Sequence, residues 1–174
     1  MSLTSPAITE LTIESATKAL LAEWLGDWFD GEEHDIFTGV TTATFPEADV
    51  SFDQSPIASQ DIEGTEIRVI VDAGAHKPYL SETGMEVESY VSIDFWVRSR
   101  QTNTGAGNSN YLADRVSQLL FALLQNPLSR TDLAQKGIMN MRPQKPKTFQ
   151  DANYALRLVR CKAQLQYSVT TRPT

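Results

Sequence analysis

Apolar and polar positions recur along this chain with two different periods, which predict helices and strands in turn. Residues 13–29 carry an apolar stripe at spacings of three and four, the period of an amphipathic helix. A second such stripe begins near Asn108 and ends at Gln125, because the residue before Pro127 avoids the helical conformation. A short third helical stretch is expected at 130–136. The stripes comprise Leu20, Leu21, Trp24, Leu25 and Trp28, then Leu112, Val116, Leu119, Leu120 and Leu123.

Between and after these helices the period changes to two, which indicates β-strands. β-Branched, aromatic and alternating apolar residues predict strands at 36–45, 66–72, 88–100 and 155–169. Glycine and proline interrupt the pattern at 73–86, where a long exposed hairpin-type loop is expected. In the last strand, Leu156 and Leu158 have the opposite parity to the apolar residues that follow. A bulge near Val159 or Arg160 is therefore expected to bring them to the same face.

The alternating patterns, rather than continuous apolar runs, are typical of antiparallel sheets. We therefore expect an α+β fold, in which a mainly antiparallel (mixed) sheet carries two principal helices packed on one face. A length of 174 residues fits a single domain over 1–174, with a loop insertion at 46–65. The expected core residues are Leu20, Trp24, Val69, Ile93, Phe95, Val97, Val116, Leu119, Leu123, Leu165 and Tyr167.

Charge divides unevenly along the chain. From Met1 to Tyr90 there are 18 acidic and 3 basic residues, a balance of −15, whereas Val91 to Thr174 has 4 and 12, a balance of +8. An acidic and a basic face on one subunit would attract each other between copies and favour head-to-tail assembly. If the two halves interleave in space, the asymmetry averages out instead. The acidic residues expected on assembly loops are Asp61, Glu63, Glu82 and Glu86.

The reactive side chains match no catalytic pattern, so we expect no enzyme and no cofactor or metal site. Cys161 is the only cysteine and lies on the apolar parity of its strand, which favours an inert core thiol. His34 lies among Glu32, Glu33 and Asp35, which could hold a cation or form a solvated turn. The sequence has no nucleophile elbow and no phosphate-cradling glycine loop. No membrane-spanning run and no secretory signal is visible, which favours assembly in a cytoplasm.

A basic extended segment, RPQKPK, follows the third helical stretch. Its cations are Arg142, Lys145 and Lys147, and Pro143 and Pro146 favour an extended backbone. The segment could contact a phosphate backbone, for instance DNA passing through a ring, or an acidic partner. It could also serve as a polyproline ligand or remain a solvated loop. On the strand at 88–100, the carboxylate of Asp94 is expected to pair with Arg98 or with a charge on a neighbouring strand.

The order of these elements resembles the tail-terminator (tail-completion) proteins of long-tailed bacteriophages and prophages. The resemblance is carried by the N-terminal helix, the strand VSIDFWVRSR, the polar linker after it, the helix NYLADRVSQLLFALLQ and the final strand LRLVRCKAQLQYSV. It covers nearly the whole chain as a sequence of element types. The stretch between Phe45 and Glu66 departs from the compact form of the family.

The resemblance implies a non-enzymatic virion protein, assembled in the cytoplasm of the bacterial host. Members form a ring, typically of six copies, that caps the tail tube and offers a docking face to the head. The partners implied are other copies of the chain, the tail-tube protein and the head–tail connector, with DNA passing through the ring and no membrane contact. A head–tail connector or neck protein is the nearest alternative, and a small-ligand-binding α+β domain is the alternative from another class.

Overall fold

The computed structural model describes residues 10–37, 41–52, 64–81, 84–100, 108–151 and 153–169. Three helices and eight strands are formed within these ranges. Their order is α1 (Glu10–Gly26), β1 (Glu33–Phe37), β2 (Thr41–Thr44), β3 (Asp49–Ser51), β4 (Thr65–Ser81), β5 (Gly84–Arg100), α2 (Asn108–Gln125), α3 (Pro127–Gln135), β6 (Ile138–Pro143), β7 (Lys147–Gln150) and β8 (Tyr154–Val169).

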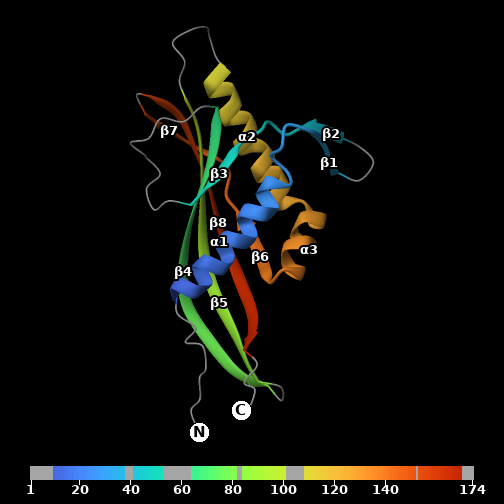
Figure 1. Cartoon of the computed structure of the whole chain (residues 1–174), viewed down its shortest axis with the longest axis vertical. Helices are drawn as coiled ribbons and strands as arrows, with labels where there is room; N and C mark the ends of the chain where they lie inside the picture. Colours follow the sequence, from blue (N-terminus) through green and yellow to red (C-terminus); the bar gives the residue numbers. More distant parts are fainter. Residues whose placement is uncertain are drawn as a thin grey trace.

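A mixed sheet forms the centre of the molecule. Its strand order is β3–β4–β5–β8–β6, and β7 also pairs with β8. β3 runs parallel to β4, whereas the other neighbouring pairs are antiparallel. β1 and β2 form a separate antiparallel pair beside the helices (Figure 1). The alternation in the sequence therefore predicted the sheet type correctly, and the α+β class is confirmed.

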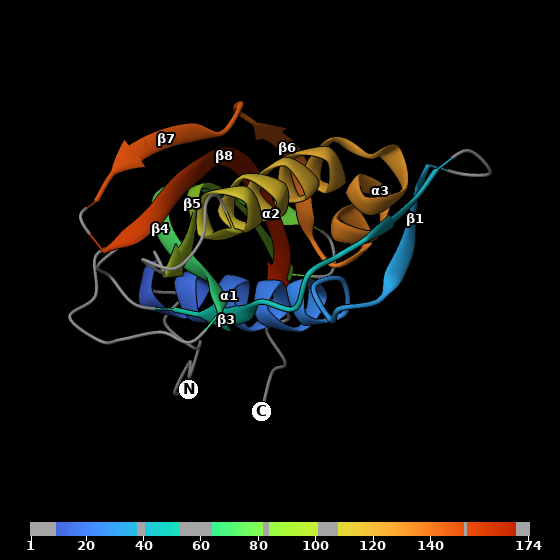
Figure 2. The same ribbon diagram turned by 90° about the horizontal axis from the view of Figure 1, so that it is seen from above.

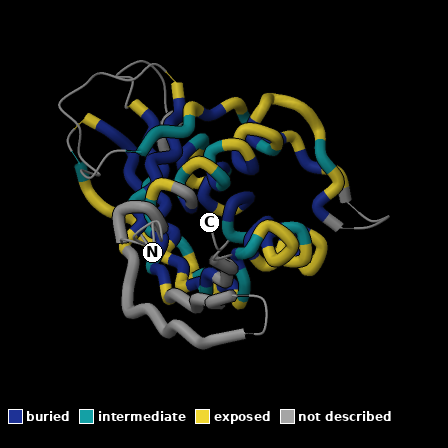
Figure 3. Tube along the Cα trace, turned by 60° about the horizontal axis from the view of Figure 1, so that its bottom comes forward, coloured by how far each residue is buried: buried dark blue, intermediate teal, exposed yellow. Residues whose placement is uncertain are grey.

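The two principal helices pack on one face of this sheet, as Figure 2 shows. Because successive strand residues point to opposite faces, the odd-numbered apolar residues of β4, β5 and β8 meet the helices. The buried positions gather between helices and sheet in Figure 3. Nine expected core residues are buried there: Trp24, Val69, Ile93, Phe95, Val97, Val116, Leu119, Leu123 and Leu165. Leu20 is only partly buried at the edge of the core, and the side chain of Tyr167 lies outside the described part.

The expected loop at 73–86 is wrong for most of its length, because β4 and β5 continue through it as one long hairpin. Residues 82 and 83 are outside the described ranges. The strands tolerate the apparent breakers for two reasons. A register shift between Ala73 and His76 absorbs Gly74. Pro78 pairs with Val87 on one side, and in the described part β3 reaches only the start of β4, so Pro78 lies along an edge.

The bulge expected near Val159 or Arg160 is also wrong, since β8 pairs with β5 without a register shift. Leu156 and Leu158 stay on the opposite face from Val159, yet all three are buried. The sequence rule failed here because both faces of this part of β8 are covered. Apolar residues therefore no longer mark a single face.

The expected strand at 36–45 is two strands, β1 and β2, which pair with each other; residues 38–40 are outside the described ranges. Within the expected insertion at 46–65, β3 adds a short parallel strand to the edge of the sheet.

Asn126 lies between α2 and α3. α2 ends where the Asn-Pro pair predicts, whereas α3 begins at Pro127, three residues before the expected start at 130. The Oδ1 of Asn126 accepts a hydrogen bond from the backbone N of Leu128 at 2.8 Å, which is N-cap geometry. Its side-chain amide also donates to the carbonyl of Ile36 in β1. This buried residue therefore ties the β1–β2 pair to the helices.

A candidate partner-binding face

The face of the sheet opposite the helices carries a row of exposed cations. Arg142 and Lys147 come from the edge strands β6 and β7, Lys145 lies between these strands, and Arg160 and Lys162 come from β8. We call these five residues the basic face. Sequence reasoning identified Arg142, Lys145 and Lys147 but missed the two cations of β8. Their even-numbered parity, opposite to the core residues of the same strand, was the available signal.

Two cations of the basic face are direct cross-strand neighbours. Arg142 pairs in register with Lys162, so both side chains leave the same side of the sheet. The register arises from a bulge between Met139 and Arg142, where Asn140 adopts a positive φ of 54°. Asn and Asp are among the residues that adopt this conformation most readily. The bulge therefore places two like charges side by side, an arrangement that is unfavourable without an anionic partner.

Arg160 differs from its neighbours because it has an acidic partner. Its Nε and Nη2 donate to the two carboxylate oxygens of Asp94 on β5 at 2.8 and 2.7 Å. These hydrogen bonds, and the charge of Asp94, raise the pKa of the Arg160 guanidinium. Asp94 thus pairs with a neighbouring strand, one of its two expected partners, and not with Arg98.

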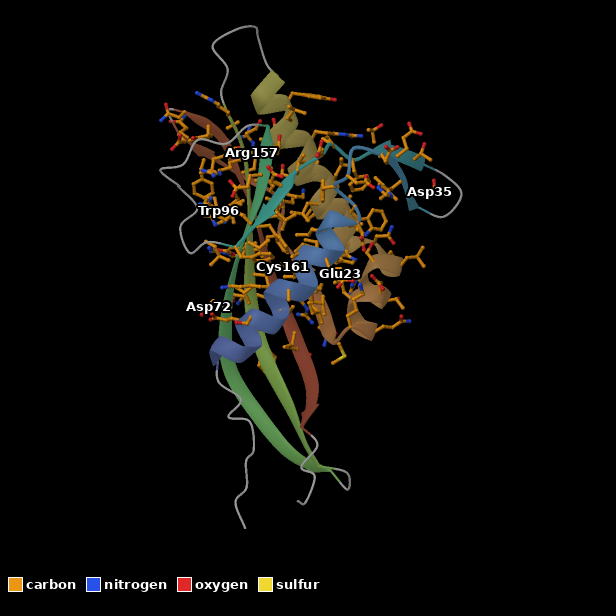
Figure 4. All side chains as sticks on the ribbon, in the orientation of Figure 1. Glu23, Asp35, Asp72, Trp96, Arg157 and Cys161 are labelled. Atoms are coloured by element: carbon orange, nitrogen blue, oxygen red, sulfur yellow. The ribbon has the colours of Figure 1, made fainter. Side chains whose placement is uncertain are left out.

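Aromatic side chains lie beside the cations. The ring of Trp96 on β5 packs against Phe149 of β7, with ring centroids 5.0 Å apart. Phe149 is 40 % exposed and Trp96 is partly buried. Figure 4 places Trp96 on the side of the subunit away from Asp35 of β1. A partly exposed aromatic pair bordered by cations is a composition typical of protein–protein contact sites.

The same side of the sheet is held together by a buried ion-pair network. Glu66 of β4, only 4 % exposed, contacts Arg68 at 2.9 Å and also accepts hydrogen bonds from Arg98 and Ser51. The guanidinium of Arg98 lies 5.2 Å from the ring centroid of Tyr154. Burial raises the pKa of Glu66, but the hydrogen bonds from Ser51, Arg98 and Arg68 outweigh it and leave the pKa below its ordinary value.

Six of the ten exposed acids that the structure describes gather at a different place, the turn after α1 and the β1–β2 pair. They are Asp27, Asp30, Glu32, Glu33, Asp35 and Glu47, which we call the acidic corner. An aromatic cluster supports them: Phe45 packs against Trp28 and Phe29, with ring centroids 5.4 and 5.2 Å apart. The ring of His34 packs against Trp28 and Phe45.

Hydrogen bonds fix the turn of the acidic corner. Asp30 Oδ1 accepts from the backbone N of Glu32 at 2.9 Å and lies 2.8 Å from His34 Nε2. The backbone hydrogen bond and the His34 contact lower the pKa of Asp30. In the described ranges, no group of three or more His, Cys, Asp or Glu side chains is arranged to hold a metal ion.

The four acidic residues after Val91 are engaged within their own subunit. Besides the Asp94–Arg160 pair, Asp114 contacts Arg157 and Asp132 lies 3.9 Å from Lys136. Asp151 accepts hydrogen bonds from two backbone N–H groups. Of the described acidic side chains, none is paired with Arg142, Lys145, Lys147 or Lys162. Some of the charge asymmetry is thus neutralised internally, as Glu66 with Arg98 illustrates. Most of the described exposed acids nevertheless lie in the acidic corner, away from the basic face.

The remaining predicted site residues are Asp61, Glu63, Glu82 and Glu86. Asp61, Glu63 and Glu82 lie outside the described residues. Glu86 belongs to strand β5, paired with Tyr79 and Ser168, and not to a loop.

The RPQKPK segment is held against β8. The backbone N of Gln144 donates to the carbonyl of Arg160 at 2.8 Å, and β7 pairs with β8 just beyond it. It is therefore neither a free loop nor a detached polyproline segment.

Cys161 is buried on the core face, beside Met141, as its parity predicted. Burial raises the pKa of its thiol to about 12.

No protein-family model and no curated protein sequence matches this chain. Across the described residues, no helix combines the length and the apolar character needed to cross a bilayer.

Proposed function

We propose that this chain is a tail terminator of a long-tailed bacteriophage or prophage, a structural protein that caps the tail tube as a ring of copies and offers a docking face to the head. The observation that carries the proposal is the segregation of exposed charge. The unpaired cations Arg142, Lys145, Lys147 and Lys162 gather on one face of the sheet, whereas six of the ten described exposed acids gather in the acidic corner. A head-to-tail contact joins two different surfaces of the same subunit, and opposite charges make these two surfaces complementary.

The order of elements supports the same proposal. An N-terminal helix, a strand with the sequence VSIDFWVRSR, a helix from Asn108 and a long final strand follow one another as in the resembling family. In this proposal, the additional partners are the tail-tube protein and the head–tail connector, and the site of action is the virion tail.

Deletion of the gene from its phage or prophage tests this function. Without a terminator, the tail tube should continue to elongate. Electron micrographs of lysates should therefore contain tails of variable and excessive length. Expression of the chain in trans should restore uniform tails. Loss of a connector would instead leave tails of normal length detached from filled heads. Unchanged particles would contradict both phage functions and favour the small-ligand-binding alternative.

A further inference from the structure

We propose that the basic face of one copy docks against the acidic corner of a second copy. The inference rests on the proposed function in one respect only, namely that the chain works as an assembly of copies. It names the two surfaces that meet.

The basic face lacks its counter-charge within the subunit. Arg142 and Lys162 are cross-strand neighbours, and Lys145 and Lys147 extend the row along the edge of the sheet. Three described acids share this face. Asp94 is engaged by Arg160, Glu66 is engaged by Arg68 and Arg98, and exposed Asp72 lies two strands from Lys162, with Ser92 between them. None of the three is paired with Arg142, Lys145, Lys147 or Lys162. Adjacent like charges favour a partner that brings carboxylates.

An aromatic contact gives the basic face an anchor besides charge. Trp96 and Phe149 pack together on this side of the sheet, and Phe149 keeps 40 % of its surface exposed. Aromatic residues and arginine, here Trp96, Phe149 and Arg142, are enriched in protein–protein interfaces.

A second copy of this chain supplies the matching surface. Of the acidic corner, Asp27, Glu32, Glu33, Asp35 and Glu47 are exposed and have no basic partner among the described side chains. In Figures 1 and 2, β7 and the β1–β2 pair lie on opposite sides of the subunit. Two complementary surfaces on opposite sides produce a head-to-tail contact that each added copy can repeat.

A nucleic acid would also bring negative charge, but the whole chain carries a net charge of −7. The excess of negative charge elsewhere on the subunit would repel a phosphate backbone. A second copy is also negative overall, but it presents its acidic corner to the basic face. The attraction between these two surfaces offsets the repulsion between the net charges. The observations therefore favour protein over nucleic acid as the occupant.

Charge reversal on the purified chain tests the contact. Lys145→Glu/Lys147→Glu should weaken self-association in sedimentation equilibrium by about tenfold or more, because attractive contacts become repulsive. Glu32→Lys/Glu33→Lys should weaken it similarly. The chain that carries all four substitutions should regain self-association, because the two reversed surfaces are again complementary.

The matched control is Arg130→Glu/Lys136→Glu, which changes the net charge equally on exposed positions of helix α3 and just after it. It should leave self-association within about twofold of the wild type. Circular dichroism and thermal melting of each variant establish that it is folded. Raising the salt concentration from 0.1 M to 1 M, which shortens the Debye length from about 10 Å to about 3 Å, should weaken the wild-type contact.

Three results would overturn the inference. They are a wild-type chain that remains monomeric at every concentration, reversals no more harmful than the control, and a four-substitution chain that stays dissociated. Binding of duplex DNA by the wild type, lost in Lys145→Glu/Lys147→Glu without any change in self-association, would replace the protein partner by a nucleic acid. Gene deletion tests the proposed function separately. If deletion gives overgrown tails and any of the results above is also obtained, the proposed function stands and only the inferred interface is refuted.

Discussion

Asp94 and Arg160 face each other across β5 and β8, and their side chains form two parallel hydrogen bonds of 2.8 and 2.7 Å. Arg160 is about half exposed, so the pair contributes little to folding. We expect Asp94→Asn to change the free energy of unfolding by less than about 1 kcal/mol, as measured by urea denaturation.

The same substitution leaves Arg160 without its counter-charge. The basic face then becomes more positive, and self-association should strengthen; weaker association would contradict the inferred interface.

Glu66 should be the most sensitive carboxylate of the described sheet. Glu66→Gln leaves two buried arginines, Arg68 and Arg98, without their shared negative charge, and we expect a loss of about 3–5 kcal/mol at pH 7. Asp72→Asn is the matched control on the same strand and is exposed, so it should cost less than about 0.5 kcal/mol. Equal effects of the two variants would show that the network does not stabilise the fold.

The cost of Glu66→Gln should also depend on pH. The folded-state pKa of Glu66 lies below its ordinary value of 4.5, so the ionised carboxylate stabilises the fold above that pH. This stabilisation is lost as the pH falls through the folded-state pKa, when the wild type also becomes neutral at this position. Denaturation curves of the two proteins should therefore converge in acid; a difference that stays constant from pH 7 into acid would contradict the pKa assignment.

Phe95 and Phe149 offer a comparison of one residue type on the two faces of the sheet. Phe95 is fully buried against the helices, and Phe95→Ala should cost about 3–5 kcal/mol. Phe149 is 40 % exposed, and Phe149→Ala should cost about 1 kcal/mol, since it buries less apolar surface. Chemical denaturation measures both, and a reversed order would mean that the helix-facing register of β5 is wrong.

Cys161 should be chemically silent in the folded chain. With a thiol pKa of about 12, only about 0.01 % of the thiol is ionised at pH 8, and the side chain is buried. Native protein should therefore not react with a thiol-specific disulfide reagent within hours, whereas one equivalent should react in denaturant. Rapid labelling of the native chain would indicate frequent local opening of β8.

The triple change of Arg142, Lys145 and Lys147 to Glu separates folding from assembly. All three side chains are exposed, so the melting temperature should remain close to that of the wild type. A phage lacking the gene should not be restored to full infectivity by this variant. Full complementation would mean that the segment is a solvated surface without a partner.

Parity along the strands was enough to predict the core face. The alternation from Val91 to Val97 assigned Ile93 and Phe95 to the helix side, and both are fully buried there. Parity failed in β8, where Leu156 and Leu158 are buried on the other face. A period of two reports burial only where a strand has one solvated face.

The long hairpin and the basic face depended on pairing, which one strand's sequence does not contain. Pro78 and Gly74 are breakers in isolation, and only the pairing of β4 with β5 explains their presence in a strand. Likewise, Arg142 and Lys162 are 20 positions apart in sequence and become neighbours through the register of β6 and β8. The cations of the RPQKPK segment could be named from sequence, but their neighbours could not.

The position of β8 in the sheet has a consequence for synthesis of the chain. β8 follows the other described strands in sequence, yet it lies between β5 and β6. The hairpin of β4 and β5 can form early, because its strands are adjacent in the chain. The pairing of β5 with β8, for instance of Met85 with Val169, can form only after β8 has been made. Until the ribosome has released β8, one edge of β5 remains open to pairing with other nascent chains. The sheet can therefore be completed only after β8 has been made, and until then the open edge of β5 exposes the chain to aggregation.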